Sequence, residues 1–136
     1  MIMKQLKEKV AIITGCGQGI GKGVALCMAK RGVRVACIGR RLGPVEETAK
    51  EIEALGSQAI AISCDTSDRE GVLAAVKKTV ETFGSVDILI NNAGISGPTA
   101  LVVETREGRK EYTPEDFSTV LAPNLTGTFM CCQEAA

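Results

Sequence analysis

The sequence predicts an α/β fold, an open and doubly wound parallel sheet with helices on both faces. Three observations lead to this prediction. Short apolar runs alternate with helical patterns, the helical stretches are long enough to cross back over a sheet, and glycine-rich or polar residues follow the runs. Crossovers between parallel strands are right-handed, and both faces of such a sheet are covered. With 136 residues, 45% of them hydrophobic, residues 1–136 are expected to form one domain.

The first two strand–helix units occupy residues 10–55. An apolar run at residues 10–13 predicts a strand, and helical spacing follows it at Ile20, Val24, Cys27, Met28 and Arg31. Residues 33–38 predict a second strand. Pro44 introduces the next helix, acidic residues at 46 and 47 suit its first turn, and its expected buried stripe is Val45, Ala49, Ile52 and Leu55.

A third unit starts with a strand at residues 59–63. Ser67 and Glu70 have the spacing of a capping box, which predicts the start of a helix. Gly84 ends this helix, whose apolar face is expected at Val72, Val76, Val80 and Phe83. A fourth strand is expected at residues 88–90. In an open parallel sheet the ligand binds at the carboxyl ends of the strands.

The last part of the chain contains a loop and a helix. Residues 95–113, with Gly97-Pro98 and a charged run, predict a solvated loop that could act as a substrate lid. Thr113 and Pro114 then have the order of a capping residue and a first helical position. The pattern continues through Phe117, Val120, Leu121, Leu125, Thr128, Phe129 and Cys132. It shows no stop signal before Ala136, so we expect a truncation within this helix.

The segment TGCGQGIG at residues 14–21 joins the first expected strand to the first helix. Glycines let the backbone turn sharply and approach a ligand, and the free N–H groups of a helix N-terminus can face a phosphate. The spacing fits neither G-x-G-x-x-G nor the Walker pattern, and leaves T-G-x-x-x-G-x-G. A glycine-rich turn without a ligand is the alternative.

A second motif, NNAG at residues 91–94, follows the fourth strand. With both motifs, essentially the whole chain resembles the short-chain dehydrogenase/reductase family. The resemblance implies a Rossmann-type fold and hydride transfer between a nicotinamide cofactor and a carbonyl or alcohol. The cofactor-binding positions that it implies, together with those of the glycine turn, are Thr14, Gly15, Cys16, Gln18, Gly19, Ile20, Gly21, Arg40, Arg41, Asp65, Thr66, Asn91, Asn92, Ala93 and Gly94.

Arg40 and Arg41 end the second strand, where an acidic residue would hold the ribose hydroxyls of NAD. Two guanidinium groups can instead pair with a ribose 2′-phosphate, so NADP is the expected cofactor and NAD the alternative. Two solvated arginines in a turn are also possible. By resemblance Asp65, with Thr66 beside it, faces the adenine edge, although a local turn or helix-start hydrogen bond fits Asp65 equally well.

Small residues in NNAG permit close approach of the nicotinamide ribose, and Thr14 and Asn91 are also expected to tie neighbouring strand ends together. By resemblance Asn124 is a catalytic position whose backbone carbonyl supports a water in a proton relay. Pro123 fits this role, because an interior proline frees a carbonyl one turn earlier and kinks the helix.

The serine, tyrosine and lysine that the family uses for catalysis have no match in this chain. The motif is Y-x-x-x-K, but Tyr112 is the only tyrosine and its fourth following residue is Asp116. The chain therefore resembles the cofactor-binding half of an NADP-dependent oxidoreductase that acts on a small carbonyl or alcohol, with a homo-oligomer expected for the complete protein. A non-catalytic dinucleotide-binding or regulatory module is the alternative, and a non-enzymatic scaffold is a third.

Composition limits the other partners. Sixteen basic and sixteen acidic residues cancel, which gives no indication of nucleic acid or a membrane surface. The chain shows no apolar run near the ~20 residues of a membrane span and no signal-peptide core, so a cytoplasmic protein is expected. Six cysteines without C-x-x-C spacing, and no histidine, predict no metal site. Cys16 lies beside a helix N-terminus that could lower its pKa, or it simply fills space.

Overall fold

The computed structural model describes residues 6–98 and 100–136, so residues 1–5 of the N-terminal segment and Thr99 of the expected loop lie outside the described residues. Four parallel strands form one sheet in the order β3-β2-β1-β4: β1 (Val10–Thr14), β2 (Arg34–Gly39), β3 (Ala59–Ser63) and β4 (Ile88–Ile90). The predicted doubly wound α/β sheet is confirmed.

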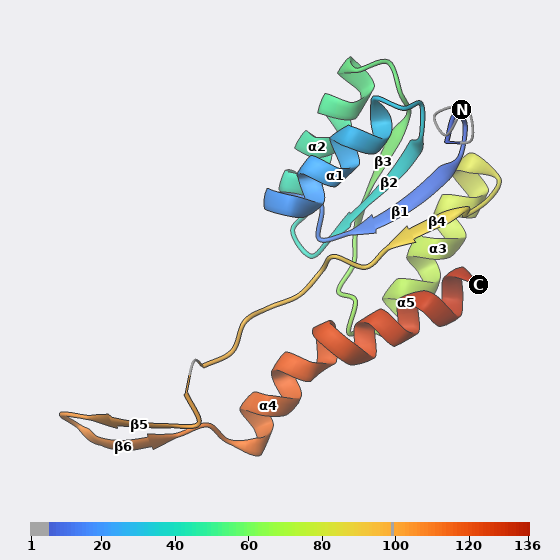
Figure 1. The fold of residues 1–136 in the computed structure, drawn as a ribbon. Helices are drawn as coiled ribbons and strands as arrows, with labels where there is room; N and C mark the ends of the chain where they lie inside the picture. The colour runs from blue at the N-terminus through green and yellow to red at the C-terminus, as the bar shows by residue number, and fades with distance from the viewer. Residues whose placement is uncertain (1–5, 99) are drawn as a thin grey trace.

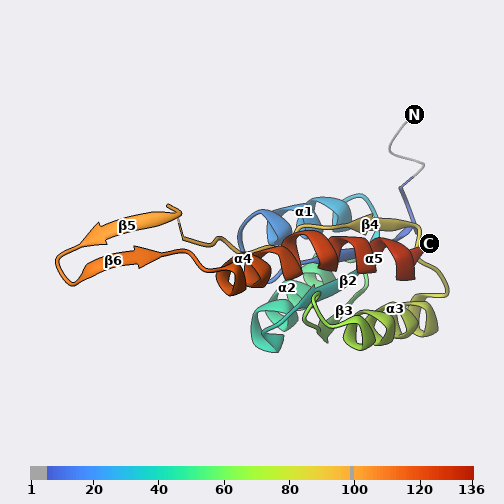
Figure 2. The ribbon, with the colours of Figure 1, turned by 90° about the horizontal axis from the view of Figure 1, so that it is seen from below.

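Helices cover both faces of this sheet (Figures 1 and 2). On one face lie α1 (Gly19–Ala29) and α2 (Leu42–Ala54), and on the other lie α3 (Arg69–Phe83) and α5 (Gly127–Ala135). Side chains alternate between the two cores, so that Ile13 packs towards α1 and α2 while Ile12 packs towards α3 and α5. All of β1 is buried because it is central and covered on both faces.

Helix α1 buries a different face from the one expected. Its buried residues are Gly21, Ala25 and Ala29, whereas Ile20 is 80% exposed. Val24 and Met28 lie half-buried at the side of the core. Small side chains at the contact let the helix approach the sheet closely, so residue size determines the buried face here more than hydrophobicity does.

Two corrections concern α2 and α3. Helix α2 begins at Leu42, two residues before Pro44, and it buries the expected residues except Leu55 at its C-cap, with Thr48 in addition. Helix α3 is capped by Asp68, whose carboxylate accepts a hydrogen bond from the Glu70 N–H, rather than by Ser67. Ser67 bonds to Asp65 instead. The buried face of α3 is Val72, Ala75, Thr79 and Phe83, and Gly84 ends the helix as predicted.

The segment expected to be a loop contains an antiparallel hairpin of β5 (Val102–Thr105) and β6 (Gly108–Glu111). Thr105 Oγ1 donates to the Gly108 carbonyl and accepts from the Glu107 N–H, and Gly108 has a φ of 121°, so a tight turn closes the strands. The hairpin is solvated, as expected, since all its residues are exposed. It projects away from the sheet (Figure 2).

The C-terminal helical segment consists of α4 (Pro114–Leu121), a π-helical turn η2 (Ala122–Thr126) and α5. Thr113 caps α4 through a reciprocal capping box with Asp116, as the sequence predicts for the cap. Pro123 lies in the π-helical turn, which confirms the expected irregularity.

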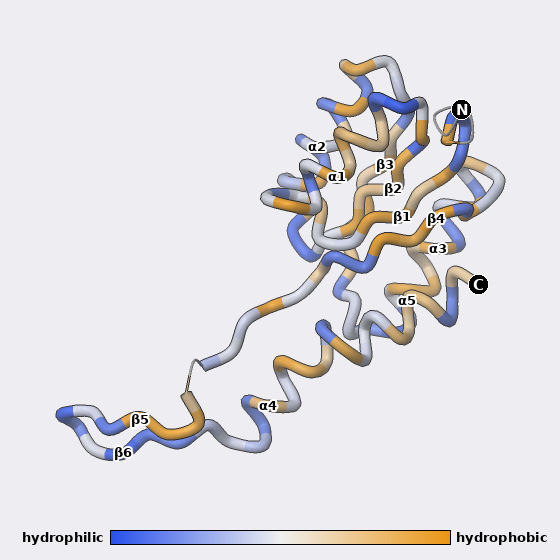
Figure 3. Tube along the Cα trace, viewed as in Figure 1, coloured by the Kyte–Doolittle hydropathy of each residue, from blue (hydrophilic) through white to orange (hydrophobic). Residues whose placement is uncertain are grey.

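The expected apolar stripe of this segment is largely exposed. Phe117 is 54%, Leu125 62% and Phe129 64% exposed, and Figure 3 shows hydrophobic positions recurring along α4 and α5. The buried residues of α5 are Gly127, Met130 and Cys131, because this is the face that packs against α3 and the sheet. Within the described residues, no helix has both the length and the apolar character needed to cross a membrane.

Candidate functional site

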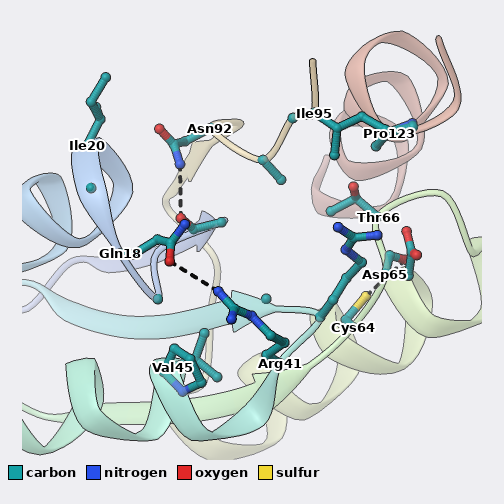
Figure 4. A pocket seen from close by; sticks show the side chains of 18 residues that line it. Gln18, Ile20, Arg41, Val45, Cys64, Asp65, Thr66, Asn92, Ile95 and Pro123 are labelled. Carbon is teal, nitrogen blue, oxygen red and sulfur yellow. Dashed lines mark hydrogen bonds between the residues drawn. The ribbon is translucent and has the colours of Figure 1, made fainter. Parts of the chain in front are cut away.

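A pocket of about 560 Å³ opens at the carboxyl ends of the four parallel strands (Figure 4). Its walls come from the turn before α1, the start of α2, the segments after β3 and β4, and the π-helical turn. The structure brings together here most of the positions that the sequence indicates, namely Gly15, Gln18, Gly19, Ile20, Arg40, Arg41, Asp65, Thr66, Asn92, Ala93 and Gly94.

Other positions differ from the expectation. The indicated residues that do not line the pocket are Thr14, Cys16, Gly21, Asn91 and Asn124. The lining residues that the sequence analysis did not single out as site residues are Gly17, Gly39, Pro44, Val45, Cys64, Ile95 and Pro123. All but the pair at 44 and 45 directly adjoin an indicated residue in the chain, so nearness to such a residue was the available signal.

The glycines of the TGCGQGIG turn serve two purposes. A Cβ on Gly15 would lie 2.9 Å from Ala93 Cα, and a Cβ on Gly17 would lie 2.9 Å from Pro44 Cβ. A Cβ on Gly21 would collide with the Asn92 amide. Gly19, with a φ of +56°, has nothing within 4 Å of a Cβ position. Three glycines therefore permit close packing, and Gly19 leaves the space open in front of α1.

The two helices that begin at the pocket lack side-chain caps. Gln18 at the start of α1 and Arg41 at the start of α2 make no capping hydrogen bond, and neither helix has an acidic residue in its first turn. In contrast, Asp68 caps α3 and Thr113 caps α4, both of which begin outside the pocket. The first N–H groups of α1 and α2 thus remain available to an anion at the positive ends of both helix dipoles.

Arg40, Arg41 and Asp65 are the charged residues that line the pocket in the described part of the chain. Arg41 Nη2 donates to Gln18 Oε1 over 3.1 Å. Asp65 Oδ1 accepts hydrogen bonds from Ser67 Oγ at 2.6 Å and from Ser67 N at 2.9 Å. These bonds lower the pKa of Asp65, and the positive charge of Arg40 lowers it further. Asp65 is therefore ionised, and it makes the local turn that the sequence left open as an alternative.

The tie between strand ends involves Asn92, and the expectation for Asn91 was wrong. Thr14 Oγ1 accepts hydrogen bonds of 3.0 Å from Asn92 N and Ala93 N, while Asn92 Nδ2 donates to the carbonyls of Thr14 and Gly15 over 3.1 Å. The Asn91 amide instead donates to Cys132 Sγ. The two side chains therefore point to different partners, and only that of Asn92 reaches β1.

Asn124 lies at the edge of the pocket and holds the segment that follows β4. Its Oδ1 accepts from Ile95 N and its Nδ2 donates to Ile95 O, both over 2.8 Å. A Cβ on Gly94 would lie 2.9 Å from Asn124 Oδ1, so this contact requires the glycine. The Asn124 carbonyl accepts from Thr128 Oγ1. The sequence indicated the backbone carbonyl of Asn124 but gave no signal for the side-chain contact.

Cys16 is fully buried under the glycine turn. Its pKa is lowered first by a hydrogen bond with Cys37 and then, against the effect of burial, by a backbone hydrogen bond at Ile38. The cause is therefore a neighbouring thiol rather than the helix N-terminus that the sequence suggested, and burial agrees with the space-filling alternative. Among residues 6–98 and 100–136, no three histidine, cysteine, aspartate or glutamate side chains gather as a metal site would require.

Known proteins resemble this chain in sequence and in fold. The 2-dehydro-3-deoxy-D-gluconate 5-dehydrogenase of Dickeya dadantii is 35% identical over 131 residues, which is 96% of this chain and 48% of that protein. The structure of a 3-ketoacyl-ACP reductase from Sinorhizobium meliloti has a TM-score of 0.83 and 40% identity, covering 93% of this chain and 47% of the other. An NAD⁺-bound xylitol dehydrogenase has a TM-score of 0.83 and 29% identity, covering 96% and 48%.

The chain spans about half the length of the curated relatives it matches. The family model described as short chain dehydrogenase matches residues 9–136, which includes both glycine-containing motifs and all four strands of the sheet. The chain therefore belongs to the short-chain dehydrogenase family.

Proposed function

We propose that the whole protein is an NADP(H)-dependent oxidoreductase that transfers hydride between nicotinamide and a carbonyl or alcohol, and that this chain supplies the cofactor-binding half. The observation that carries the proposal is the pair of uncapped helix N-termini, those of α1 and α2, opening onto one pocket beside two arginines. Pyrophosphate and phosphate are the anions that such N–H groups hold well. The relatives named above include a reductase and two dehydrogenases.

Each part of the pocket has a role in this proposal. The first turn of α1, with the open space at Gly19, holds the pyrophosphate, and Arg40 and Arg41 contact the 2′-phosphate. Asp65 is ionised, so its carboxylate can accept a hydrogen bond from the adenine amino group but cannot donate one. Ala93 and Gly94 are small enough to admit the nicotinamide ribose.

When bound, the cofactor supplies the hydride donor or acceptor. The chain's own residues contribute to the proton path at Asn124. Its side chain is held by Ile95, and its carbonyl accepts from the Thr128 hydroxyl. We assign the water-binding position to this carbonyl because the π-helical turn at Pro123 disturbs the regular helical bonding beside it.

Calorimetric titration of the protein with NADPH and NADH tests the cofactor assignment. A charge-assisted contact of roughly 1.5 to 3 kcal/mol predicts about a ten- to hundredfold preference for NADPH. The preference should fall when the arginines at 40 and 41 are replaced by alanine. Equal affinities in the unaltered protein would contradict the NADP assignment, and so would a preference unchanged by both replacements.

A reduction assay separates the enzyme from a non-catalytic dinucleotide-binding module. The complete protein should oxidise NADPH in the presence of at least one member of a panel of ketones and aldehydes, and its coding sequence should contain a serine and a Y-x-x-x-K motif beyond Ala136. Tight cofactor binding without turnover, together with a stop codon after Ala136, would favour the module.

A further inference from the structure

Gln18 and Arg41 link the N-termini of α1 and α2 across the mouth of the pocket (Figure 4). Each residue holds the N-cap position of its helix, yet neither side chain bonds to its own helix. Both are exposed, so burial does not force them together. The link leaves the first N–H groups of both helices free and places a guanidinium beside them.

The two arginines of this corner have different partners. Arg40 lies close enough to Asp65 for its charge to favour the ionised carboxylate. Arg41 bonds to the neutral amide oxygen of Gln18. Two guanidinium groups and one carboxylate give the pocket lining a net charge of +1. Because the Asp65 carboxylate offsets the charge of Arg40, the remaining positive charge is that of Arg41. An anion entering here meets no competing carboxylate at Arg41.

We propose that Gln18 is a positioning residue for cofactor choice: it holds the Arg41 guanidinium in place, so that Arg41 rather than Arg40 carries the main contact to the 2′-phosphate of NADP(H). This inference rests on the NADP(H) dependence proposed above. An arginine ordered before binding loses less side-chain freedom when the phosphate arrives. A neutral partner occupies one of its donors and leaves the guanidinium charge uncompensated.

The test begins with changes at Gln18 and Lys22 in the protein made from its complete coding sequence. Gln18→Ala removes the partner of Arg41. Gln18→Glu keeps the length of the side chain but gives Arg41 a carboxylate that competes with phosphate. Lys22→Ala is the matched control, because Lys22 Nζ and Glu51 Oε1 form the other link between α1 and α2, at 2.8 Å and outside the pocket.

The readout is the ratio of the NADH and NADPH dissociation constants, measured by calorimetry. We expect Gln18→Ala to lower the preference for NADPH by about three- to tenfold and Gln18→Glu by about tenfold or more, from the strength of a charge-assisted contact. Lys22→Ala should leave the ratio unchanged. Arg41→Ala should lower it more than Arg40→Ala does. A 2′,5′-ADP titration against 5′-AMP should show the same order, which locates the effect at the 2′-phosphate.

The outcomes separate this inference from the proposed function. If the unaltered protein prefers NADPH and Gln18→Glu keeps that preference, the role of Gln18 is wrong while the proposed function stands. The role is also wrong if Arg40→Ala has the larger effect, or if Lys22→Ala lowers the ratio as much as Gln18→Ala. If the unaltered protein binds neither cofactor, or binds both equally, the NADP(H) dependence fails and the inference fails with it.

Discussion

Gly21 of α1 lies directly against the side-chain amide of Asn92, with no room for a Cβ between them. A Cβ at residue 21 would also lie 2.5 Å from the Gly15 carbonyl oxygen and 2.9 Å from Cys16 Cα. Two of these neighbours are backbone atoms, which cannot move aside as a flexible side chain can. The last glycine of the turn, Gly21, is therefore required by the contact between α1 and the strand ends.

Gly21→Ala should destabilise the protein, and Gly23→Ala should stabilise it. Overpacking at residue 21 costs about 1–3 kcal/mol, which outweighs the gain of up to about 1 kcal/mol from replacing glycine by alanine inside a helix. Gly23 lies in the same helix with nothing within 4 Å of its Cβ position, so only that gain applies. Urea unfolding measures both changes. Equal stabilisation by the two replacements would show that the contact at Asn92 is not tight.

Thr14 is expected to contribute to stability through its hydroxyl. This oxygen is the acceptor for the N–H groups of Asn92 and Ala93, and the Thr14 side chain is buried. Thr14→Val keeps the shape but leaves both N–H groups without this acceptor, so the free energy of unfolding should fall by about 1–3 kcal/mol. Thr14→Ser keeps the hydroxyl and should lose less in the same urea titration. A valine variant as stable as the serine variant would contradict this.

Asp87 should make the free energy of unfolding depend on pH in the acid range. Its Oδ1 accepts from Lys9 Nζ and its Oδ2 from Val10 N, and these bonds hold its pKa below the ordinary value of 3.8. The unfolded chain then binds more protons near this pKa, so this stabilisation is present above about pH 5 and is lost as pH falls through the lower, folded-state pKa.

Asp87→Asn should remove this part of the pH dependence, because an amide does not titrate. The variant should be less stable than the unaltered protein at pH 7, and the difference should shrink as pH falls below about 4. Urea unfolding at a series of pH values measures it. Asp65 and Asp116 also have lowered pKa values, but they remain in both proteins and cancel in the difference. A difference that stays constant down to pH 2.5 would contradict the role of Asp87.

The sequence predicted the four strands and the glycine turn because both depend on local patterns. It did not distinguish Gly19 from Gly21, since one opens to the pocket and the other meets Asn92, which is more than 70 positions away. For the same reason, the sequence did not predict the exposure of Ile20. Hydrophobic spacing indicates a helix, but the packing of Gly21 against strand ends decides which face is buried.

The hairpin and the Asn124 contact were missed for other reasons. Residues 102–111 are exposed and largely charged. Because neither strand buries a face, the sequence shows no alternation of apolar and polar residues that would distinguish these strands from a loop. Arg106 and Glu107, the two residues between the paired Thr105 and Gly108, are not one of the common two-residue turn sequences. The Asn124 side chain bonds to the backbone of Ile95. Because nearly every residue type carries the same backbone groups, the residue type at position 95 does not indicate this contact.

Asn124→Ala should lower turnover in the complete enzyme far more than it lowers cofactor affinity. The change removes two hydrogen bonds of 2.8 Å to Ile95 and frees the segment after β4 beside the π-helical turn. Loss of a positioned proton path costs on the order of 10²-fold or more in kcat, whereas the groups proposed to bind the phosphates and the adenine, the first turn of α1 with Arg40, Arg41 and Asp65, belong to other segments. The Kd for NADPH should therefore change by only about threefold or less, on the scale of one exposed hydrogen bond.

Steady-state kinetics and calorimetry on the same preparations measure the two effects. Ser118→Ala is the matched control, because it removes a hydroxyl that bonds within the same helical segment, to the Pro114 carbonyl, without touching Ile95 or the pocket. It should leave kcat and the Kd for NADPH unchanged. Active-site titration corrects for unfolded protein in each sample. A lower melting temperature in Asn124→Ala, with full turnover per folded molecule, would show that Asn124 only supports the irregular turn and has no part in proton transfer.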